Sequence, residues 1–154
     1  MIWQAVMILR NQDGGGEVIL LSLPFHQKHM DMPMSVKFFT SNPAGLLADF
    51  KKRINQKEAE GSITTWEIIA SGAFTHKGKQ YSRDAFFRAE AKPDQGLLLF
   101  KMIRPEGKNI TSRAYAYYHG HLIETFLNHF DSQFSSAAAS AYPADGDIVS
   151  APKT

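Results

Sequence analysis

The residues best suited to chemistry lie near the end of the chain, in the triplet His119-Gly120-His121, which Glu124 follows three positions later. A neutral imidazole can act as a general base or as a metal ligand. The chain contains no cysteine, which excludes thiolate nucleophiles, disulfides and cysteine-ligated metals. No Gly-x-Ser-x-Gly nucleophile motif is present either. Histidine is therefore the first candidate for catalysis.

A helix must position these histidines, because residues 110–134 have a clear helical period. At about 100° per residue, one face about 180° wide is apolar. This face consists of Tyr115, Tyr118, Leu122, Ile123, Phe126, Leu127, Phe130 and Phe134. His119 falls near the middle of this face, whereas His121 and Glu124 fall on the far side. Burial penalises a charged imidazole, so we expect the pKa of His119 to be lowered.

The candidate catalytic residue is His119, as a general base in a cavity between the sheet and this last helix. Tyr115, Tyr118, His119 and Leu122 are the expected ligand-binding residues. The competing interpretation is a core histidine whose ring is satisfied by a backbone carbonyl or a tyrosine hydroxyl. His119 and His121 stand about 160° apart on a helix and cannot hold one ion together. We therefore expect no metal site, and the sequence indicates no cofactor.

A second group of possible ligands lies earlier in the chain, where His26 and His29 precede Met30, Met32 and Met34. Thioether and imidazole ligands together are typical of copper sites in exported proteins. Alternate methionines also fill one face of an extended segment as adaptable core residues. The second interpretation applies here, because the sequence shows no export signal.

The rest of the chain reads as strands and one further helix. A glycine-rich turn joins apolar runs that predict a hairpin, and a shorter strand comes before the first helix. Residues 63–104 alternate with period two and predict three antiparallel strands in a meander. The expected elements are strands at 2–9, 18–23 and 36–40, a helix at 43–58, the meander, and the last helix.

We therefore expect an α+β fold, with an antiparallel sheet of about five to six strands, two helices packed on it, and the order β-β-β-α-β-β-β-α. Residues 1–134 form one expected domain. Residues 135–154 are small and polar and bury too little surface to offset the entropy of ordering, so we expect a disordered tail.

Composition narrows the function classes. The formal net charge is only +2, and the densest basic cluster (Lys51, Lys52, Arg53 and Lys57) lies on a helix that needs a solvated side. Nucleic-acid binding is not favoured. No apolar run approaches the ~20 residues that cross a bilayer, so we expect a cytoplasmic protein without a membrane partner.

For function, we expect a non-enzymatic binding or adaptor module for a protein or a small apolar ligand. The absence of a recognisable catalytic motif and the amphipathic tyrosines favour this class. The alternative is a small enzyme that uses His119 as its base.

Overall fold

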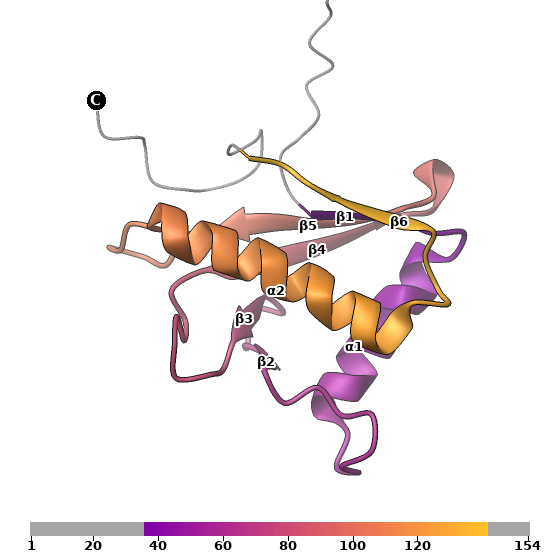
Figure 1. Cartoon of the computed structure of the whole chain (residues 1–154), viewed down its shortest axis with the longest axis horizontal. Helices are drawn as coiled ribbons and strands as arrows, with labels where there is room; N and C mark the ends of the chain where they lie inside the picture. The colour runs from indigo at the N-terminus through magenta and orange to yellow at the C-terminus, as the bar shows by residue number, and fades with distance from the viewer. Residues whose placement is uncertain (1–35, 142–154) are drawn as a thin grey trace, which may run out of the picture. The chain divides into compact units, whose positions relative to one another are not determined.

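A computed structural model describes residues 36–141 of the 154-residue chain. This part contains one six-stranded antiparallel sheet and two α-helices (Figure 1). The strands are β1 (Val36–Phe39), β2 (Trp66–Ile68), β3 (Phe74–His76), β4 (Phe86–Lys92), β5 (Leu97–Ile103) and β6 (Ser136–Ala139); the helices are α1 (Pro43–Asn55), α2 (Ser112–Phe130) and the short 3₁₀ helix η1 (Pro93–Gln95). Within the sheet the order is β2-β3-β4-β5-β1-β6. The predicted α+β class with an antiparallel sheet is confirmed.

Three predictions lie outside the described residues. These are the hairpin at 2–9 and 18–23, the segment with His26, His29 and the three methionines, and the last part of the predicted tail, 142–154. The domain boundary at 134 stays a prediction.

The sequence offers Ser41 or Asn42 as the cap of the first helix and Thr111 or Ser112 as the cap of the last, and the structure uses Asn42 and Thr111. The Asn42 side chain accepts a hydrogen bond from the Gly45 amide (3.0 Å), and Pro43 occupies the first turn of α1. Thr111 accepts in the same way from the Ala114 amide (3.1 Å) at the start of α2. The first helix ends at Asn55, three residues before the predicted end, because Gln56 already has extended backbone angles.

The core is a layer of aromatic rings between the sheet and the helices. The Phe100 ring of β5 lies 5.9 Å from Phe50 of α1 and 5.6 Å from Phe126 of α2, so both helices cover the same face of the sheet. Phe38 of β1 stacks on Phe126 at 4.0 Å. All four rings are fully buried. Burial of several large rings is the main favourable contribution to the stability of a domain this small.

The predicted three-stranded meander is wrong in one respect, because four strands form. The Ile69 amide bonds to the Ala73 carbonyl (2.9 Å) and the Gly72 amide to the Ile69 carbonyl (2.8 Å), which closes a tight turn. Gly72 has a φ of +82°, which favours glycine. This turn separates β2 from β3 inside what reads as a single period-two run. The period-two pattern predicts that the returning strand starts at Tyr81, but β4 begins only at Phe86, and the residues before it form a loop.

The predicted disordered tail begins too early. Ser136–Ala139 form β6, which pairs antiparallel with β1 along its whole length. A strand is held by its backbone hydrogen bonds, so small side chains do not prevent it once a neighbouring strand offers an edge. Ala137 also packs against the core. As a consequence β1 is an interior strand of the sheet and β6 lies at its edge (Figure 1).

Helix α2 buries a narrower face than its sequence predicts. Tyr118, Leu122, Phe126 and Phe130 are buried as expected, but the Leu127 side chain is 54% exposed. The buried arc centres nearer to Leu122, which turns Leu127 toward solvent. Phe134 lies beyond the end of the helix and still packs on Phe38, at 5.2 Å.

Candidate functional site

His119, the predicted catalytic residue, is packed between two rings. Its ring stacks on Tyr115 at 4.0 Å and meets Phe87 edge-on at 5.5 Å, and the residue is only 4% exposed. Nδ1 must carry the proton, because it donates to the Tyr115 carbonyl (2.8 Å). Nε2 is buried without a hydrogen-bond partner among the described residues. Burial lowers the pKa of His119, as predicted, and the hydrogen bond to Tyr115 opposes this only in part.

The other predicted ligand-binding residues are divided between two surroundings. Tyr115 lies with His119. The Tyr118 hydroxyl instead donates to the Tyr81 carbonyl (2.8 Å) and lies 3.1 Å from the Thr75 hydroxyl. Leu122 is fully buried in the core. Rings fill the space between the sheet and α2, and neither of the two surface hollows described below includes any of the four residues. Their role in binding stays a prediction.

The structure brings together a second cluster that the sequence does not predict, and we call it the histidine–aromatic cluster: Trp66, His76, Tyr117 and His121. The His76 and His121 rings lie 4.9 Å apart and nearly perpendicular. The His121 ring stacks on both Trp66 and Tyr117, at 5.5 Å each. His121 is therefore held among rings, whereas its position on the helix predicts an outward side chain.

Hydrogen bonds fix the proton positions in this cluster. His76 Nδ1 donates to the Gln80 carbonyl (3.1 Å), so its Nε2 accepts from the Tyr117 hydroxyl (3.2 Å). His121 Nδ1 is 3.0 Å from a carboxylate oxygen of Glu124. The Nε2 atom of His121 is buried and has no partner in the described part of the chain. Each imidazole is thus oriented by a hydrogen bond at Nδ1, and Tyr117 occupies the Nε2 atom of His76.

Burial makes the charged forms of this cluster unfavourable. It lowers the pKa of His76, and the neighbouring His121 adds to that effect through charge repulsion. Burial also raises the pKa of the Tyr117 hydroxyl, and the carboxylate of Glu124 adds to it. The cluster is therefore neutral at His76 and Tyr117 near pH 7, and Tyr117 is not activated as a nucleophile.

A strained loop closes over the cluster. Tyr81 and Arg83 both have a φ of +56°, a conformation that costs a non-glycine residue on the order of 1 kcal/mol or more. Arg83 is anchored by its ion pair with Glu67 (2.8 Å). Gly78 passes so close to His76 that an added Cβ would lie 2.5 Å from the ring. The loop therefore covers His76, and only 3% of the surface of this residue is exposed.

This arrangement offers imidazoles without an opening for a substrate. The nearer hollow, of about 390 Å³, reaches the cluster only at Trp66. No group of three His, Asp or Glu side chains between residues 36 and 141 could hold a metal ion. We therefore assign the cluster to the packing of the β2–β3 hairpin against α2.

Only the tertiary structure could identify this cluster. In the sequence, His76 has the position of the first residue of a turn. In the structure, the β2–β3 pairing places it opposite Trp66. The Trp66 indole donates to the Thr125 hydroxyl (2.9 Å), which itself donates to the His121 carbonyl (2.7 Å). No spacing in the sequence signals these contacts.

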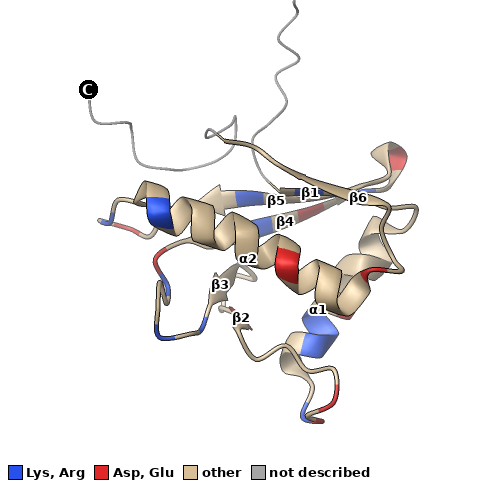
Figure 2. Ribbon diagram, viewed as in Figure 1, with Lys and Arg blue, Asp and Glu red and all other residues tan. Residues whose placement is uncertain are grey.

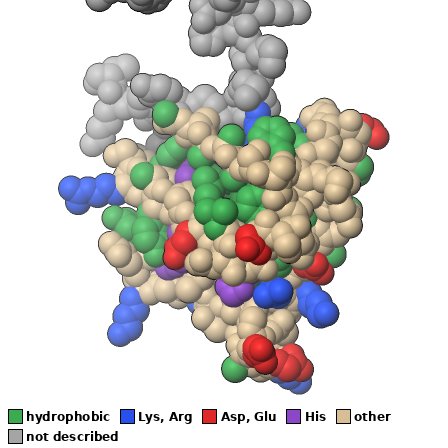
Figure 3. Space-filling view, turned by 45° about the vertical axis from the view of Figure 1, so that its right-hand side comes forward, with side chains coloured by type: hydrophobic (Ala, Val, Ile, Leu, Met, Phe, Trp, Pro, Cys, Tyr) green, Lys and Arg blue, Asp and Glu red, His purple; other side chains and the backbone are tan. Residues whose placement is uncertain are grey.

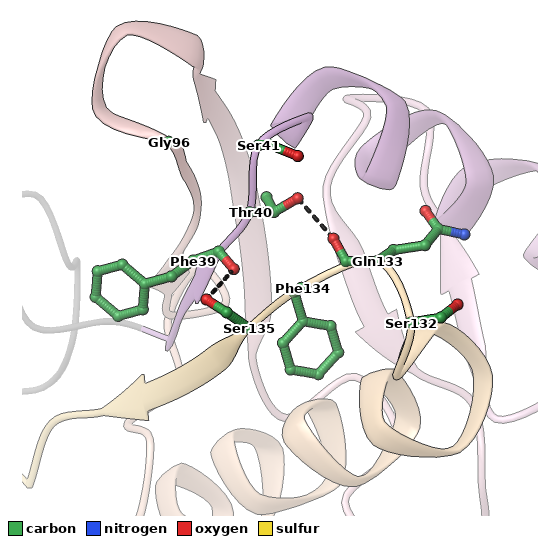
Figure 4. Close-up of a pocket in the computed structure, with 8 residues that line it drawn as sticks. All are labelled: Phe39, Thr40, Ser41, Gly96, Ser132, Gln133, Phe134 and Ser135. Carbon is green, nitrogen blue, oxygen red and sulfur yellow. Dashed lines mark hydrogen bonds between the residues drawn. The ribbon is translucent and has the colours of Figure 1, made fainter.

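The second hollow has a volume of about 560 Å³ and lies where α2 connects to β6 (Figure 4). It is lined by Phe39, Thr40, Ser41, Gly96, Ser132, Gln133, Phe134 and Ser135. The Thr40 hydroxyl donates to the Gln133 carbonyl (2.6 Å), and the Ser135 hydroxyl to the Phe39 carbonyl (3.1 Å). These bonds place β6 beside β1, so two of the hydroxyls already have a structural role.

The outward face of α2 carries a row of exposed small and apolar residues. Four residues lie within an arc of about 60° on this helix: Ala116, Gly120, Ile123 and Leu127. We call them the α2 row. Ala116, Gly120 and Leu127 are exposed and Ile123 is partly exposed. Over its nineteen residues α2 has only two Lys, Arg, Asp or Glu side chains, Arg113 and Glu124 (Figure 2).

Hydrophobic side chains gather on the face where α2 and β6 lie (Figure 3). Leu127 of α2 is a large hydrophobic residue with 54% of its surface exposed. Gly120 adds a depression, because a Cβ built there would meet no atom within 4 Å. Glycine inside a helix costs about 0.5–1 kcal/mol relative to alanine. Packing within the described residues gives no reason for that cost.

Comparisons with models of protein families, with curated proteins and with solved structures gave no match. Among the described helices, none combines the length and the apolar character needed to cross a membrane.

Proposed function

We propose that this protein is a non-enzymatic protein-binding module and that the α2 row is its contact surface. The single observation that carries the proposal is Gly120, a glycine in the middle of a helix with open space above it. A glycine there lets another backbone approach closely, which compensates for its cost within the helix.

The neighbours of Gly120 support the same proposal. Ile123 and Leu127 add apolar surface on the C-terminal side of Gly120. On the N-terminal side, the small side chain of Ala116 extends the depression. The centres of protein interfaces are depleted in charged residues, and the α2 row contains none.

The other expected functions have weaker support. A small apolar ligand between the sheet and α2 would have to displace buried rings such as Phe38 and Phe126, which stack at 4.0 Å. Catalysis by His119 would need a route from solvent to Nε2, an atom that is buried. Protein binding needs only the surface that is already exposed.

Site-specific photo-crosslinking tests the proposal. A benzophenone amino acid replaces Leu127, which lies in the α2 row, and in a matched control replaces Asp94, which is exposed on η1. We expect a covalent adduct with a protein from position 127 and none from position 94 when the chain is expressed in cells. Equal yields from both positions, or no adduct from position 127, would contradict the proposal.

A second substitution links the adduct to the surface. With the crosslinker at Ile123, the variant Leu127→Glu should reduce adduct formation at least about tenfold, because a charge at the interface centre is costly to desolvate. The same variant should keep the circular dichroism spectrum of the parent, since Leu127 is exposed.

A further inference from the structure

We infer that the partner of the α2 row is a second copy of this chain, bound through an antiparallel pair of α2 helices. The inference rests on the proposed function and names its partner. Its basis is a size pattern along the row, which begins with two small residues (Ala116, Gly120) and ends with two large ones (Ile123, Leu127).

The pattern is symmetric about the midpoint between His121 and Leu122. Ala116 and Leu127 are equally far from this midpoint, and so are Gly120 and Ile123. When two such helices pack antiparallel about a two-fold axis there, Leu127 of each copy faces Ala116 of the other, and Ile123 faces Gly120. Each large side chain then fills a depression, over a row about 17 Å long. A parallel pair would place large residues on large ones.

Charge follows the same symmetry. Arg113 and Asp131 flank the row on the same side and are exposed at opposite ends of α2. Their distances from the midpoint differ by one residue, or about 1.5 Å along the axis. Asp131 keeps helical backbone angles, so it continues the spiral of the helix. In an antiparallel pair, residues on the same flank face each other, which brings Arg113 of each copy to Asp131 of the other.

The third charged residue on this flank is Glu124. In the pair, the Glu124 side chains of the two copies would approach each other near the two-fold axis. Repulsion between their negative charges would by itself oppose pairing. Each carboxylate is already bonded to His121 of its own copy at 3.0 Å. Arg113 and Asp131 form no ion pair within residues 36–141, so they are available to the second copy.

The match of side-chain sizes and the match of charges distinguish a second copy from an unrelated helix. A foreign partner would need a large side chain over Gly120, but nothing about it would require the reversed order of sizes or the matched positions of Arg113 and Asp131. Self-association through one isologous patch requires both.

Disulfide trapping tests orientation directly, since the natural chain has no cysteine. We expect Ala116→Cys mixed with Leu127→Cys to form a disulfide between the two variants. Each variant alone should form almost none, because like positions would lie about 17 Å apart along the pair, beyond the ~7 Å that a disulfide spans. Like-with-like disulfides would instead indicate a parallel pair and overturn the inference.

Sedimentation of the full chain tests the association itself. We expect a reversible dimer whose dissociation constant rises at least about tenfold in Gly120→Leu, which fills the depression. The monomer should remain folded, because the space above Gly120 is open. Arg113→Asp and Asp131→Arg should each weaken the dimer, and the double variant should recover most of the loss.

The outcomes separate the inference from the proposed function. A chain that stays monomeric at every concentration, yet is crosslinked from position 127 to another protein, would overturn the second copy and keep the binding surface. A chain that gives neither dimer nor adduct would overturn both.

Discussion

Phe126→Ala is the most direct test of how α2 is oriented. The Phe126 side chain is fully buried and stacks on Phe38 at 4.0 Å, with Phe50 at 4.9 Å and Phe130 at 5.2 Å. Removal of a buried phenylalanine ring costs about 3–5 kcal/mol, through lost transfer free energy and the cavity left behind. The cavity would be lined by rings that are packed on several sides and can collapse only in part. We therefore expect a loss near the upper end, about 4–5 kcal/mol.

Urea unfolding followed by circular dichroism measures this loss as a lower midpoint with an unchanged slope. Leu127→Ala is the matched control, because the next residue of the same helix is 54% exposed and its truncation should cost less than about 1 kcal/mol. Both variants are compared at several protein concentrations, since association would stabilise the parent. A loss below about 1 kcal/mol for Phe126→Ala, or equal losses for the two variants, would refute the orientation of α2.

Three further predictions follow from the contacts of the described residues. Thr125→Val should destabilise by about 1–3 kcal/mol in urea unfolding, because the buried Trp66 indole loses its acceptor. Stability should be full at about pH 6.5 to 7.5 and fall as the pH drops toward the lowered folded-state pKa values of His76 and His119, with a slope of up to about 1.4 kcal/mol per pH unit from the buried His119. Truncation after Ser135 should lower the melting temperature, because β1 loses the strand with which it pairs.

Each of these predictions has its own control. Thr125→Ser keeps the hydroxyl and should cost clearly less than Thr125→Val, so equal losses would show that the hydroxyl is not the acceptor. His119→Leu should reduce the dependence of stability on pH, because one group no longer takes up more protons in the unfolded chain than in the folded one. An unchanged slope would contradict the burial of that imidazole. A truncated chain with an unchanged melting temperature would show that β6 contributes nothing to stability.

The sequence predicted those elements whose signals are local. Caps depend on side chains within three residues of the amides that they bind, so the sequence narrowed each cap to two neighbouring residues, and the structure shows Asn42 and Thr111 in that role. The near-continuous apolar run at the start of residues 97–103 likewise predicted a central strand, and β5 has these bounds. The general orientation of α2 also followed from its helical period, because the large apolar residues must turn away from water.

The predictions that failed depended on contacts between distant segments. β6 exists because β1 provides an edge, and the chain of small residues that forms it reads as disorder without that neighbour. His121 lies among rings because Trp66 of β2 stacks on it. Leu127 is exposed because no distant segment among the described residues covers it. A periodicity cannot supply such information, because it describes one segment at a time.

The candidate sites, like the fold, were predicted in part from the sequence and in part decided by the tertiary structure. The sequence by itself determined that His119 would be buried with a lowered pKa, since its angle on the helix places it within an apolar face. Only the tertiary structure decided that this burial leaves His119 packed between Tyr115 and Phe87. The tertiary structure also decided which side of α2 stays exposed. The reason is that a helix can bury only the arc its neighbours cover, and those neighbours come from distant parts of the chain.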